Sequence, residues 1–463
     1  MFRKILVLNR GEIACRILRT CRRLDIASVA VYSDADAQLP HVAEADEAIR
    51  LGPAPVKDSY LNLDAVVAAI RSSGAQAVHP GYGLLSESPR LARAVSEAGA
   101  TFIGPSPATL EQLGDKIAAR ALARSVGAEP PPGSPAPVDP AKVDAIEAEA
   151  ARIGFPIIVK AAAGGGGIGM LVVREPSELA NAVKTCADRA RQAFSDDRVY
   201  LERYLERPRH IEVQVLVDAT GTAVALGERE CSAQRRHQKV VEESPCVASF
   251  FAGAEGEARR QALFRSALAI VAAARYQGAG TVEFVFDAAG NAYFLEVNAR
   301  LQVEHPVTEM VTGLDLVEQQ IRIAQGEPLS AAVVAAKPSG HAVEVRVYAE
   351  DPAKNFIPQP GRLTRFEWPA ARPGVRIESG FGEGSEVTPY YDPLLAKVIA
   401  HGDTREHAIA NLKSALLAAH VTLTGPKGER ATNLAWLQQV LSAPEFVSGD
   451  YDTGLIGRLG ASA

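Results

Sequence analysis

The side chains between Thr281 and Glu309 could bind a metal ion. This stretch contains two runs rich in β-branched and aromatic residues, one on each side of Asp287-Ala-Ala-Gly-Asn291, a pattern that predicts a β-hairpin. Alternation along the two strands sorts the side chains onto opposite faces. One face would receive Val282, Phe284, Phe286, Tyr293, Leu295 and Val297, and the other Glu283, Glu296, Asn298 and Arg300.

A turn centred near Ala289-Gly290 would place Glu283 directly opposite Glu296, with Cβ atoms about 4.5–5.5 Å apart. Like charges at this distance repel each other, so a cation between them would stabilise the pair. Two carboxylates and the amide oxygen of Asn298 are hard oxygen ligands, which suit Mg²⁺ with substrate phosphates completing its coordination. The exposed polar face of an ordinary hairpin is the alternative, and other segments of the chain favour the metal site.

A glycine-rich segment, residues 161–169, lies between predicted strands at 156–160 and 170–173. Glycines allow successive backbone N–H groups to turn toward a phosphate, and Lys160 at the end of the first strand could reach the same phosphate. The motif G-x-x-x-x-G-K-[ST] is absent, so this is not a P-loop. The loop alone is weak support for nucleotide binding, since it would also serve as a lid over a site.

Two further segments are candidates for ligand binding. The run from Glu228 to Lys239 is dense in cationic donors and is not typical of a core element, so a solvated loop is one interpretation. Beside a phosphate site, its residues Arg235, Arg236, His237 and Lys239 would meet an anionic ligand. The segment 79–83 (His-Pro-Gly-Tyr-Gly) follows a predicted strand, where open α/β sheets bind ligands, although a tight turn explains it equally well.

Composition excludes several classes of protein. The chain has 463 residues, which predicts two to four domains, with 47% hydrophobic and 22% charged residues. A net charge of −6 without a basic block disfavours nucleic acid binding. No apolar run reaches the ~20 residues of a membrane span, and the first residues predict a strand rather than a signal peptide. The five cysteines form no C-x-x-C pair, so we expect reduced thiols in a cytoplasmic protein and no zinc site.

The elements that would position these residues follow from periodicity. Strands predicted at 4–8, 28–32, 77–79 and 101–103 alternate with helical segments such as 13–24, which indicates a doubly wound parallel sheet. The turn Asn9-Arg-Gly-Glu12 lacks the three-glycine fingerprint, so NAD is disfavoured. Six prolines between Glu129 and Pro140 predict a stiff linker and a domain boundary. Helices are predicted at 141–153, 176–194, 254–276 and 405–420, and strands at 199–203, 210–216 and 341–347.

The predicted fold class is α/β and α+β, in three parts. An N-terminal doubly wound parallel sheet occupies 1–128, and a small lid domain with the glycine-rich loop occupies 129–204. A mixed or antiparallel sheet domain occupies 205–463, with a separate C-terminal domain from about 335.

Together, these motifs resemble those of a known family. The segments 155–169 (FPIIVKAAAGGGGIG) and 294–301 (FLEVNARL) are similar to the paired signature of the carbamoyl-phosphate-synthetase-like ATP-grasp enzymes. The segments 9–14 (NRGEIA), 79–83 (HPGYG), 235–239 (RRHQK) and 302–308 (QVEHPVT) resemble biotin carboxylase. The resemblance covers essentially the whole chain. It implies ATP- and Mg²⁺-dependent carboxylation by bicarbonate of biotin on a carrier protein, through carboxyphosphate, as the first half-reaction of an acyl-CoA carboxylase such as that of fatty acid biosynthesis.

The resemblance also implies roles for individual residues. Nucleotide contacts fall on Lys116, Lys160, Gly166, Gly167, Glu202, Arg203, Tyr204, Leu205, His210, Gln234, His237, Glu283 and Glu296. Mg²⁺ or Mn²⁺ would bind Glu283, Glu296 and Asn298, in agreement with the alternation argument. Bicarbonate and biotin would meet Lys239, Arg300, Gln302, Val303 and Arg346. Glu304 would be the general base for bicarbonate and Arg346 would stabilise the biotin enolate, with Lys239 and Arg300 as cationic clamps.

The chain departs from the family pattern at several positions. Ile168 stands where a basic residue is usual, Arg203 where lysine is common, and Arg23 where bacterial members often have an acidic residue near their dimer surface. No Met-Lys-Met biotinylation site is present, so we expect biotin on a separate carrier protein, with carboxyltransferase subunits as further partners and a homodimer as a possible assembly.

Two alternatives remain open. One is another ATP-grasp ligase that joins a carboxylate to an amine, which residues 302–306 (QVEHP) disfavour. The other is a nucleotide-binding regulatory subunit, which Ile168 suggests.

Overall fold

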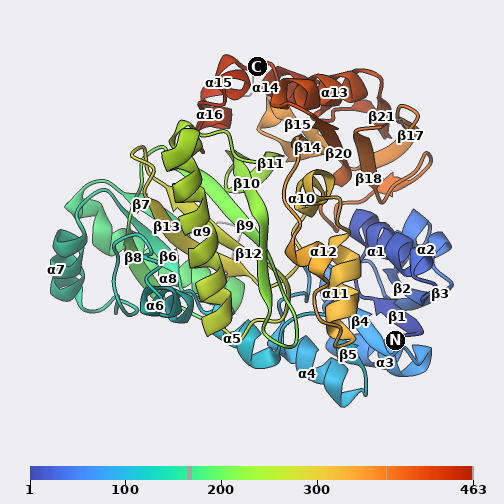
Figure 1. Cartoon of the computed structure of the whole chain (residues 1–463), viewed down its shortest axis with the longest axis horizontal. Coiled ribbons are helices and arrows are strands. Elements are labelled where there is room, and N and C mark those ends of the chain that lie inside the picture. The colour runs from blue at the N-terminus through green and yellow to red at the C-terminus, as the bar shows by residue number, and fades with distance from the viewer. Residues whose placement is uncertain (164–168, 372, 461–463) are drawn as a thin grey trace.

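A parallel sheet forms the N-terminal part of the computed structural model, which describes residues 1–163, 169–371 and 373–460 (Figure 1). The strands lie in the order β3-β2-β1-β4-β5, with bounds β1 (Lys4–Val7), β2 (Ala27–Ser33), β3 (Glu47–Gly52), β4 (Ala77–His79) and β5 (Thr101–Phe102). Ile5 and Val7 pack with helix α1 (Gly11–Arg23), whereas Leu6 and Leu8 share a core with α3 (Leu63–Ser73) and α4 (Pro89–Glu97). Helices therefore cover both faces, and the predicted doubly wound sheet is confirmed.

A small antiparallel sheet follows in the order β7-β6-β8. It consists of β6 (Ile157–Ala161), β7 (Met170–Val173) and β8 (Val199–Arg203), and it shares a core with α7 (Val143–Ile153) and α8 (Leu179–Phe194). The proline-rich segment, predicted to be a stiff linker, is hydrogen-bonded to this sheet. The N–H groups of Ser134 and Val138 donate to the carbonyls of Leu201 and Val199 on β8, so the segment lies along the edge of this sheet.

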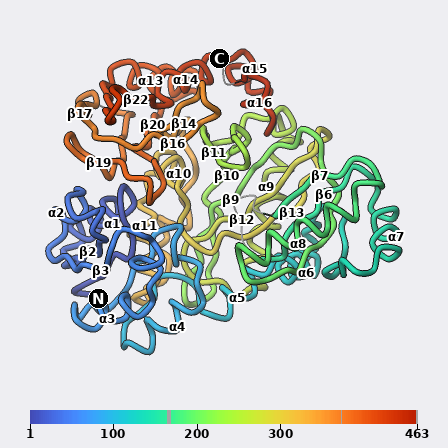
Figure 2. The backbone as a smooth tube through the Cα atoms, turned by 180° about the vertical axis from the view of Figure 1, so that it is seen from behind, coloured from blue at the N-terminus to red at the C-terminus, as the bar shows by residue number. Residues whose placement is uncertain are grey.

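An eight-stranded antiparallel sheet forms the centre of the molecule (Figures 1 and 2). Its order is β13-β12-β9-β10-β11-β14-β20-β18, with β9 (Arg209–Val217), β10 (Ala223–Arg235), β11 (Gln238–Ser244), β12 (Gly278–Phe286), β13 (Ala292–Asn298), β14 (His341–Tyr348), β18 (Val375–Ser379) and β20 (Leu394–Gly402). Strands from beyond residue 335 thus extend the sheet that begins in the middle of the chain. One sheet carries side chains from both regions.

The two faces of this sheet differ because polar and apolar residues alternate along its strands. On β9, Ile211 and Val213 pack in the same core as helix α9 (Gly253–Ala273). Glu212 and Gln214 alternate with them, and although both are buried, they take part in hydrogen bonds rather than apolar packing. Helix α10 (His305–Thr312) packs against β14 and β20. The polar face is therefore enclosed, and it holds the candidate site.

The remaining elements complete the periphery. A four-stranded sheet has the order β19-β17-β21-β22 and a further pair joins β15 to β16. These are β15 (Glu350–Asp351), β16 (Ile357–Pro358), β17 (Gly361–Glu367), β19 (Glu386–Val387), β21 (His420–Gly425) and β22 (Gly428–Arg430). The other helices are α2 (Pro40–Glu44), α5 (Pro107–Gly114), α6 (Lys116–Ser125), α11 (Leu316–Ala324), α12 (Ala331–Val334), α13 (Arg405–Leu417), α14 (Leu434–Val440), α15 (Pro444–Ser448) and α16 (Leu455–Leu459). Short 3₁₀ turns are η1 (Asp34–Asp36), η2 (Val56–Asp58), η3 (Pro176–Glu178), η4 (Ser249–Phe251) and η5 (Pro352–Lys354). Among the helices of the described residues, none combines the length and apolarity needed to span a membrane.

The hairpin β12–β13 confirms one prediction and corrects another. Glu283 pairs directly with Glu296, as the alternation predicted, but a β-bulge follows, so that Phe284 pairs with Phe294 and Leu295 has no counterpart. Phe294 therefore enters the core with 1% of its surface exposed, whereas Tyr293 and Leu295 stay partly exposed. The assignment of Tyr293 and Leu295 to the core face was wrong, because strict alternation does not anticipate the extra residue.

The cationic run from Glu228 to Lys239 is not a solvated loop. It forms most of β10 and the start of β11, and only the turn residues Arg236 and His237 are exposed. Both turn residues have positive φ, 49° and 66°, which suits the tight turns of a twisted hairpin. Burial of this run is possible because its cationic side chains meet acidic partners, namely Glu212 of β9, Glu283 of β12, Glu350 of β15 and Glu304, the residue before α10.

Candidate active site

The polar face of the central sheet gathers charged side chains around Lys239 on β11. Its ammonium group donates to Glu212 at 2.5 Å, to Glu304 at 2.6 Å and to Glu283 at 2.8 Å. Burial alone would lower the pKa of Lys239, but these three carboxylates raise it well above its ordinary value. Lys239 therefore stays charged, with its N–H donors engaged by three carboxylates.

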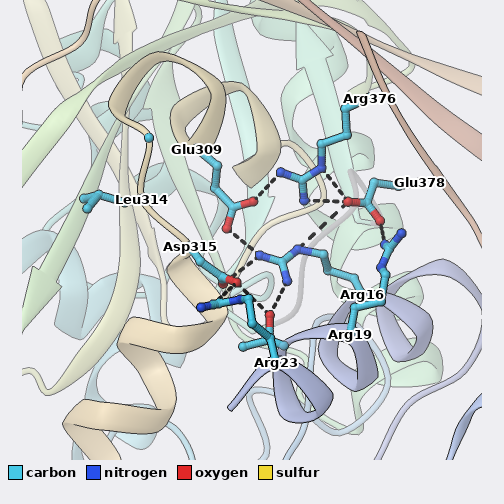
Figure 3. A pocket seen from close by; sticks show the side chains of 10 residues that line it. Arg16, Arg19, Arg23, Glu309, Leu314, Asp315, Arg376 and Glu378 are labelled. Carbon is cyan, nitrogen blue, oxygen red and sulfur yellow. Dashed lines mark hydrogen bonds and ion pairs between the residues drawn. The ribbon is translucent and has the colours of Figure 1, made fainter. Parts of the chain in front are cut away.

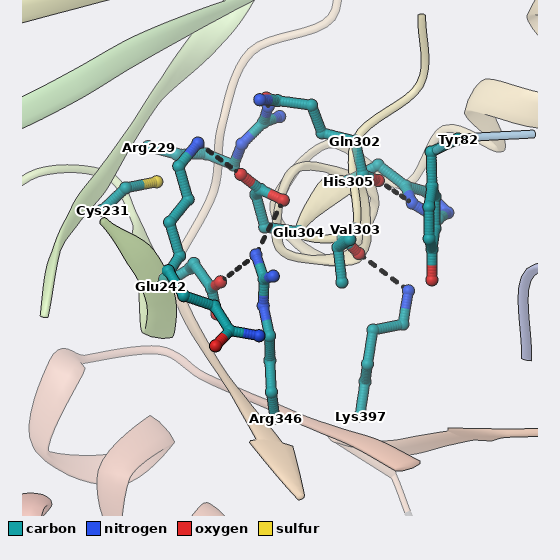
Figure 4. Close-up of polar contacts among 12 residues, drawn as sticks. Tyr82, Arg229, Cys231, Glu242, Gln302, Val303, Glu304, His305, Arg346 and Lys397 are labelled. Carbon is teal, nitrogen blue, oxygen red and sulfur yellow. Dashed lines mark hydrogen bonds and ion pairs between the residues drawn. The ribbon is translucent and has the colours of Figure 1, made fainter. Parts of the chain in front are cut away.

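Glu304, the predicted general base, is held between two cations (Figure 4). One carboxylate oxygen accepts from Lys239, and the other accepts from Arg346 of β14 at 3.0 Å. Burial raises its pKa, but Lys239, Arg346 and Arg229 outweigh burial and hold the pKa of Glu304 well below its ordinary value. A carboxylate stabilised in this way is a weak base until ligands engage the cations beside it.

Arg346 also contacts Glu242, whose Oε1 lies 2.5 Å from its guanidinium. Glu242 is fully buried on β11 and lies opposite Glu344 of β14, which is also fully buried. The pKa of Glu242 is raised to about 7, chiefly by burial and then by the charge of Glu304, although the charge of Arg346 lowers it. The predicted biotin contact Arg346 therefore stands between the candidate base and a second carboxylate.

Arg229 is a member of this cluster that the sequence did not single out. Its side chain is fully buried and donates to Glu212 at 2.5 Å and to Gln302 at 2.8 Å, with further bonds to Gln214, Thr281 and Thr308. It thereby orients Gln302, a predicted bicarbonate contact. Glu212 was detectable in principle, because the strict alternation of residues 210–216 places it on the polar face with His210, whereas Arg229 was not separable from its cationic neighbours.

The residues predicted for nucleotide binding adjoin this cluster. Lys160 at the end of β6 forms an ion pair with Glu202 on β8, and Arg120 of α6 contacts the same carboxylate. His210 lies 2.9 Å from Glu283, which raises its pKa against the effect of burial. Burial and then the charges of Lys160, His210 and Lys116 lower the pKa of His237, which lies in the turn between β10 and β11. Gln234 approaches His210 at 3.4 Å.

The predicted adenine contacts lie at the end of β8. The N–H groups of Arg203 and Tyr204 already donate to the carbonyls of Pro132 and Pro156, at 2.6 and 2.9 Å. These two N–H groups are therefore already engaged within the chain. Gly166, Gly167 and Ile168 lie outside the described residues, so their predicted roles stay predictions.

The predicted metal ligands combine oxygen donors with competing cations. Glu283 is buried and accepts from His210, Lys239 and Gln302. Glu296, with 30% of its side chain exposed, lies 3.3 Å from Lys116, and the amide oxygen of Asn298 accepts from Arg300 at 2.9 Å. Two opposed carboxylates and an amide oxygen suit a hard divalent ion. The fit requires Lys116 and His210 to share these carboxylates with the ion.

Arg300 is held beside Glu283 and Glu304 rather than bonded to them. Its guanidinium donates to Glu87 at 3.0 Å, and Glu87 also accepts from the N–H of Ala299 at 2.8 Å. Burial lowers the pKa of Arg300, but Glu87 and then Glu304 raise it above its ordinary value. Arg300 thus stays charged, and its guanidinium is held by Glu87 and Asn298.

A separate charged cluster lies where α1 meets the segment after α10 (Figure 3). Arg16 donates to Glu309 at 2.7 Å and to Asp315 at 2.8 Å. Arg23 contacts Asp315 at 2.7 Å and Glu318 at 2.6 Å. The positive charge of Arg23 is therefore compensated by acidic residues of its own chain.

Comparisons with known proteins agree over the whole chain. Residues 1–110 match the biotin carboxylase N-terminal domain, 115–332 the ATP-binding domain of the carbamoyl-phosphate synthase L chain, and 344–458 the biotin carboxylase C-terminal domain. A biotin carboxylase of Halalkalibacterium halodurans is 48% identical, with 98% of this chain and 97% of that protein covered. The human mitochondrial propionyl-CoA carboxylase alpha chain is 46% identical, and this chain spans 60% of its length with 98% of its own residues.

Solved structures show the same similarity. The chain superposes on a biotin carboxylase–β,γ-ATP complex from Campylobacter jejuni with a TM-score of 0.93 and 39% identity, covering 99% of both chains. It superposes on the biotin carboxylase domain dimer of Hydrogenobacter thermophilus 2-oxoglutarate carboxylase with a TM-score of 0.92 and 39% identity, covering 99% and 98%. That structure contains MgADP, ADP and bicarbonate.

Proposed function

Because this chain belongs to the biotin carboxylase family, we infer that it carboxylates biotin with bicarbonate at the expense of ATP. The products are carboxybiotin, ADP and phosphate. The observation that carries this assignment within the site is the contact of Lys239 and Arg346 with the two oxygens of Glu304. A base placed between two cations suits a reaction that brings two anions, bicarbonate and the triphosphate, to one place.

Glu304 gains basicity as the substrates bind. Bicarbonate draws on the charge of Lys239 and Arg300, and the ureido oxygen of biotin draws on Arg346. Each contact weakens the stabilisation of the Glu304 carboxylate, so its pKa rises toward the value that proton transfer needs. The base is therefore strong only when both substrates are present, which limits cleavage of ATP in the absence of biotin.

The other predicted residues hold the reactants in place. Lys160 and His237 face the nucleotide from the small sheet and from the β10–β11 turn, and Gln302, oriented by Arg229, completes the bicarbonate contacts. Glu283, Glu296 and Asn298 would hold Mg²⁺, which offsets charge on the transferred phosphoryl group. Arg346 would stabilise the negative charge that develops on the ureido oxygen of biotin.

Partners follow from the chemistry. Biotin would come on a separate carrier protein, and carboxyltransferase subunits would take the carboxyl group to an acceptor. Several relatives are propionyl-CoA carboxylase alpha chains, so an acyl-CoA acceptor is part of the proposal. This chain spans 60–68% of the length of those relatives. A homodimer is also proposed, since a related biotin carboxylase domain is described as a dimer. The five cysteines are buried free thiols, which agrees with a cytoplasmic location.

The test is fixation of labelled bicarbonate into free biotin by the purified protein with Mg·ATP. We expect ATP cleavage that depends on both biotin and bicarbonate, with one carboxybiotin formed per ADP. Omission of biotin is the control. Transfer to an amine without biotin would support the other ATP-grasp ligases, and nucleotide binding without any turnover would support a regulatory subunit; either result would contradict the proposal.

A further inference from the structure

A fully buried lysine lies behind the candidate base. Lys397, on β20, has 0% of its surface exposed and donates to the carbonyl of Val303 at 2.7 Å (Figure 4). It lies directly opposite Arg346 across the pairing of β14 with β20. A buried ammonium group costs free energy unless it is paired, and two neighbouring cations add repulsion. Lys397 therefore needs carboxylates around it, and Glu378 lies directly opposite it on β18.

The charge of Lys397 is compensated from the N-terminal sheet. Glu12, on α1, lies 3.2 Å from its ammonium group, and the hydroxyl of Tyr82 donates to the same carboxylate oxygen. Tyr82 lies in the segment 79–83 that the sequence singled out, and its carbonyl accepts from Asn9 at 2.8 Å. This segment joins the carboxyl ends of β1 and β4 to the active site. The backbone at Glu12 packs closely against Gly380, where an added Cβ would lie only 2.2 Å from the Glu12 nitrogen.

The carbonyl that Lys397 holds controls the direction of Glu304. Val303 and Glu304 share a planar peptide, so the position of the Val303 oxygen sets where the backbone of Glu304 begins. On the other side of this turn, the backbone carbonyl of Gln302 accepts a hydrogen bond from the ring of His305 at 2.8 Å. Glu304 is the residue before α10, and its backbone lies outside the helical region. Without Lys397, rotation of this one peptide would move the Glu304 carboxylate away from Lys239.

We propose that Lys397 is a positioning residue for biotin carboxylation, which holds the Val303 carbonyl so that Glu304 faces bicarbonate, with Glu12 and Tyr82 keeping its charge in the core. This proposal rests on the proposed function. A displacement of about 1 Å at a reacting group can lower the rate about 10²-fold. We therefore expect Lys397→Met to lower kcat about 10- to 100-fold and to raise KM for bicarbonate, with KM for ATP within about twofold of the unchanged protein.

The experiment compares Lys397→Met, Glu12→Gln and the double variant in steady-state carboxylation of free biotin, with bicarbonate and ATP varied separately. Lys397→Met alone leaves Glu12 buried without its cation, so its melting temperature should fall. The double variant removes both charges and should recover stability. If Lys397 positions Val303, the double variant keeps the low kcat and the raised KM for bicarbonate.

Recovery of kcat in the double variant would overturn the proposal, because Lys397 would then act only by neutralising Glu12. The double variant remains informative even if Lys397→Met does not fold. Arg405→Met is the matched control: Arg405 is another buried cation, which donates to Glu243 at 2.6 Å and to the carbonyl of Phe446 at 2.7 Å, away from the site. It should lose stability without a selective change in KM for bicarbonate. If the protein without any substitution fixes no bicarbonate into biotin, the proposed function itself is refuted. That outcome is distinct from a failure of the Lys397 proposal, which requires an active parent protein.

Discussion

Replacement of Glu304 by glutamine removes the candidate base while keeping the shape of the side chain. The surrounding cations keep partners, since Lys239 still contacts Glu212 and Glu283 at 2.5 and 2.8 Å, and Arg346 still contacts Glu242 at 2.5 Å. The variant should therefore fold and bind Mg·ATP. Because the pKa of Glu304 is depressed, its ionised form stabilises the fold above the usual carboxyl pKa of 4.5, so the variant should melt somewhat lower at neutral pH but not in acid.

The rate should fall much further than the stability. A lost general base lowers kcat about 10²–10⁴-fold, which corresponds to about 2.7–5.5 kcal/mol of activation free energy. The assay is biotin-dependent ADP release at pH 8, with nucleotide affinity measured by calorimetry on the same preparation. Glu243→Gln is the matched control, because Glu243 is an equally buried carboxylate of β11 that contacts Arg405 and His341 outside the site. Carboxylation by Glu304→Gln within about threefold of the unchanged protein would refute the assignment.

Three further predictions follow from other residues. Glu296→Gln should shift the Mg²⁺ dependence of ATP cleavage to higher concentration, since it removes one of two opposed carboxylates, and an unchanged Mg²⁺ titration would reject the hairpin site. Ile168→Arg adds a cation to the glycine-rich loop and should lower KM for ATP about 3- to 30-fold, and an equal or higher KM would show that the side chain points away from the phosphates. Burial and the charge of Glu242 raise the pKa of Glu344 well above its ordinary value, in spite of Lys397. As pH rises, the Glu344 carboxyl ionises in the unfolded chain before it ionises in the folded protein, so the free energy of unfolding falls above about pH 4.5. Glu344→Gln should therefore raise the melting temperature more at pH 8 than at pH 4.5. An equal change at both values would contradict this reasoning.

Local patterns in the sequence predicted much of the fold. The strands at 77–79, 170–173 and 199–203 are those observed, because β-branched runs between turn residues have few competing conformations. Alternation around a recognisable turn also predicted that Glu283 faces Glu296. The bulge at Leu295 was not predictable in this way, because it depends on Phe294 packing in a core that is built from distant segments.

Most of the family motifs concern residues that are predicted to touch substrates, and these were accessible from the sequence for the same reason: their spacing is local. Residues that act through others were not. Arg229 and Lys397 lie in β10 and β20, and each acts on the turn at 302–304 from a distant part of the chain. Their roles depend on which strands become neighbours, and long-range pairing is not encoded in local periodicity.

The sequence by itself determined which residues lie on the polar faces of strands, and therefore which chemical groups were available for a reaction. Only the tertiary structure decided how those groups act on one another. Glu304 is a carboxylate in either description, but its pKa is depressed because the fold brings Lys239 and Arg346 against it, and their charges outweigh the effect of burial. Coulomb interactions depend on distance and on the surrounding dielectric, and both are set by packing between segments far apart in the chain.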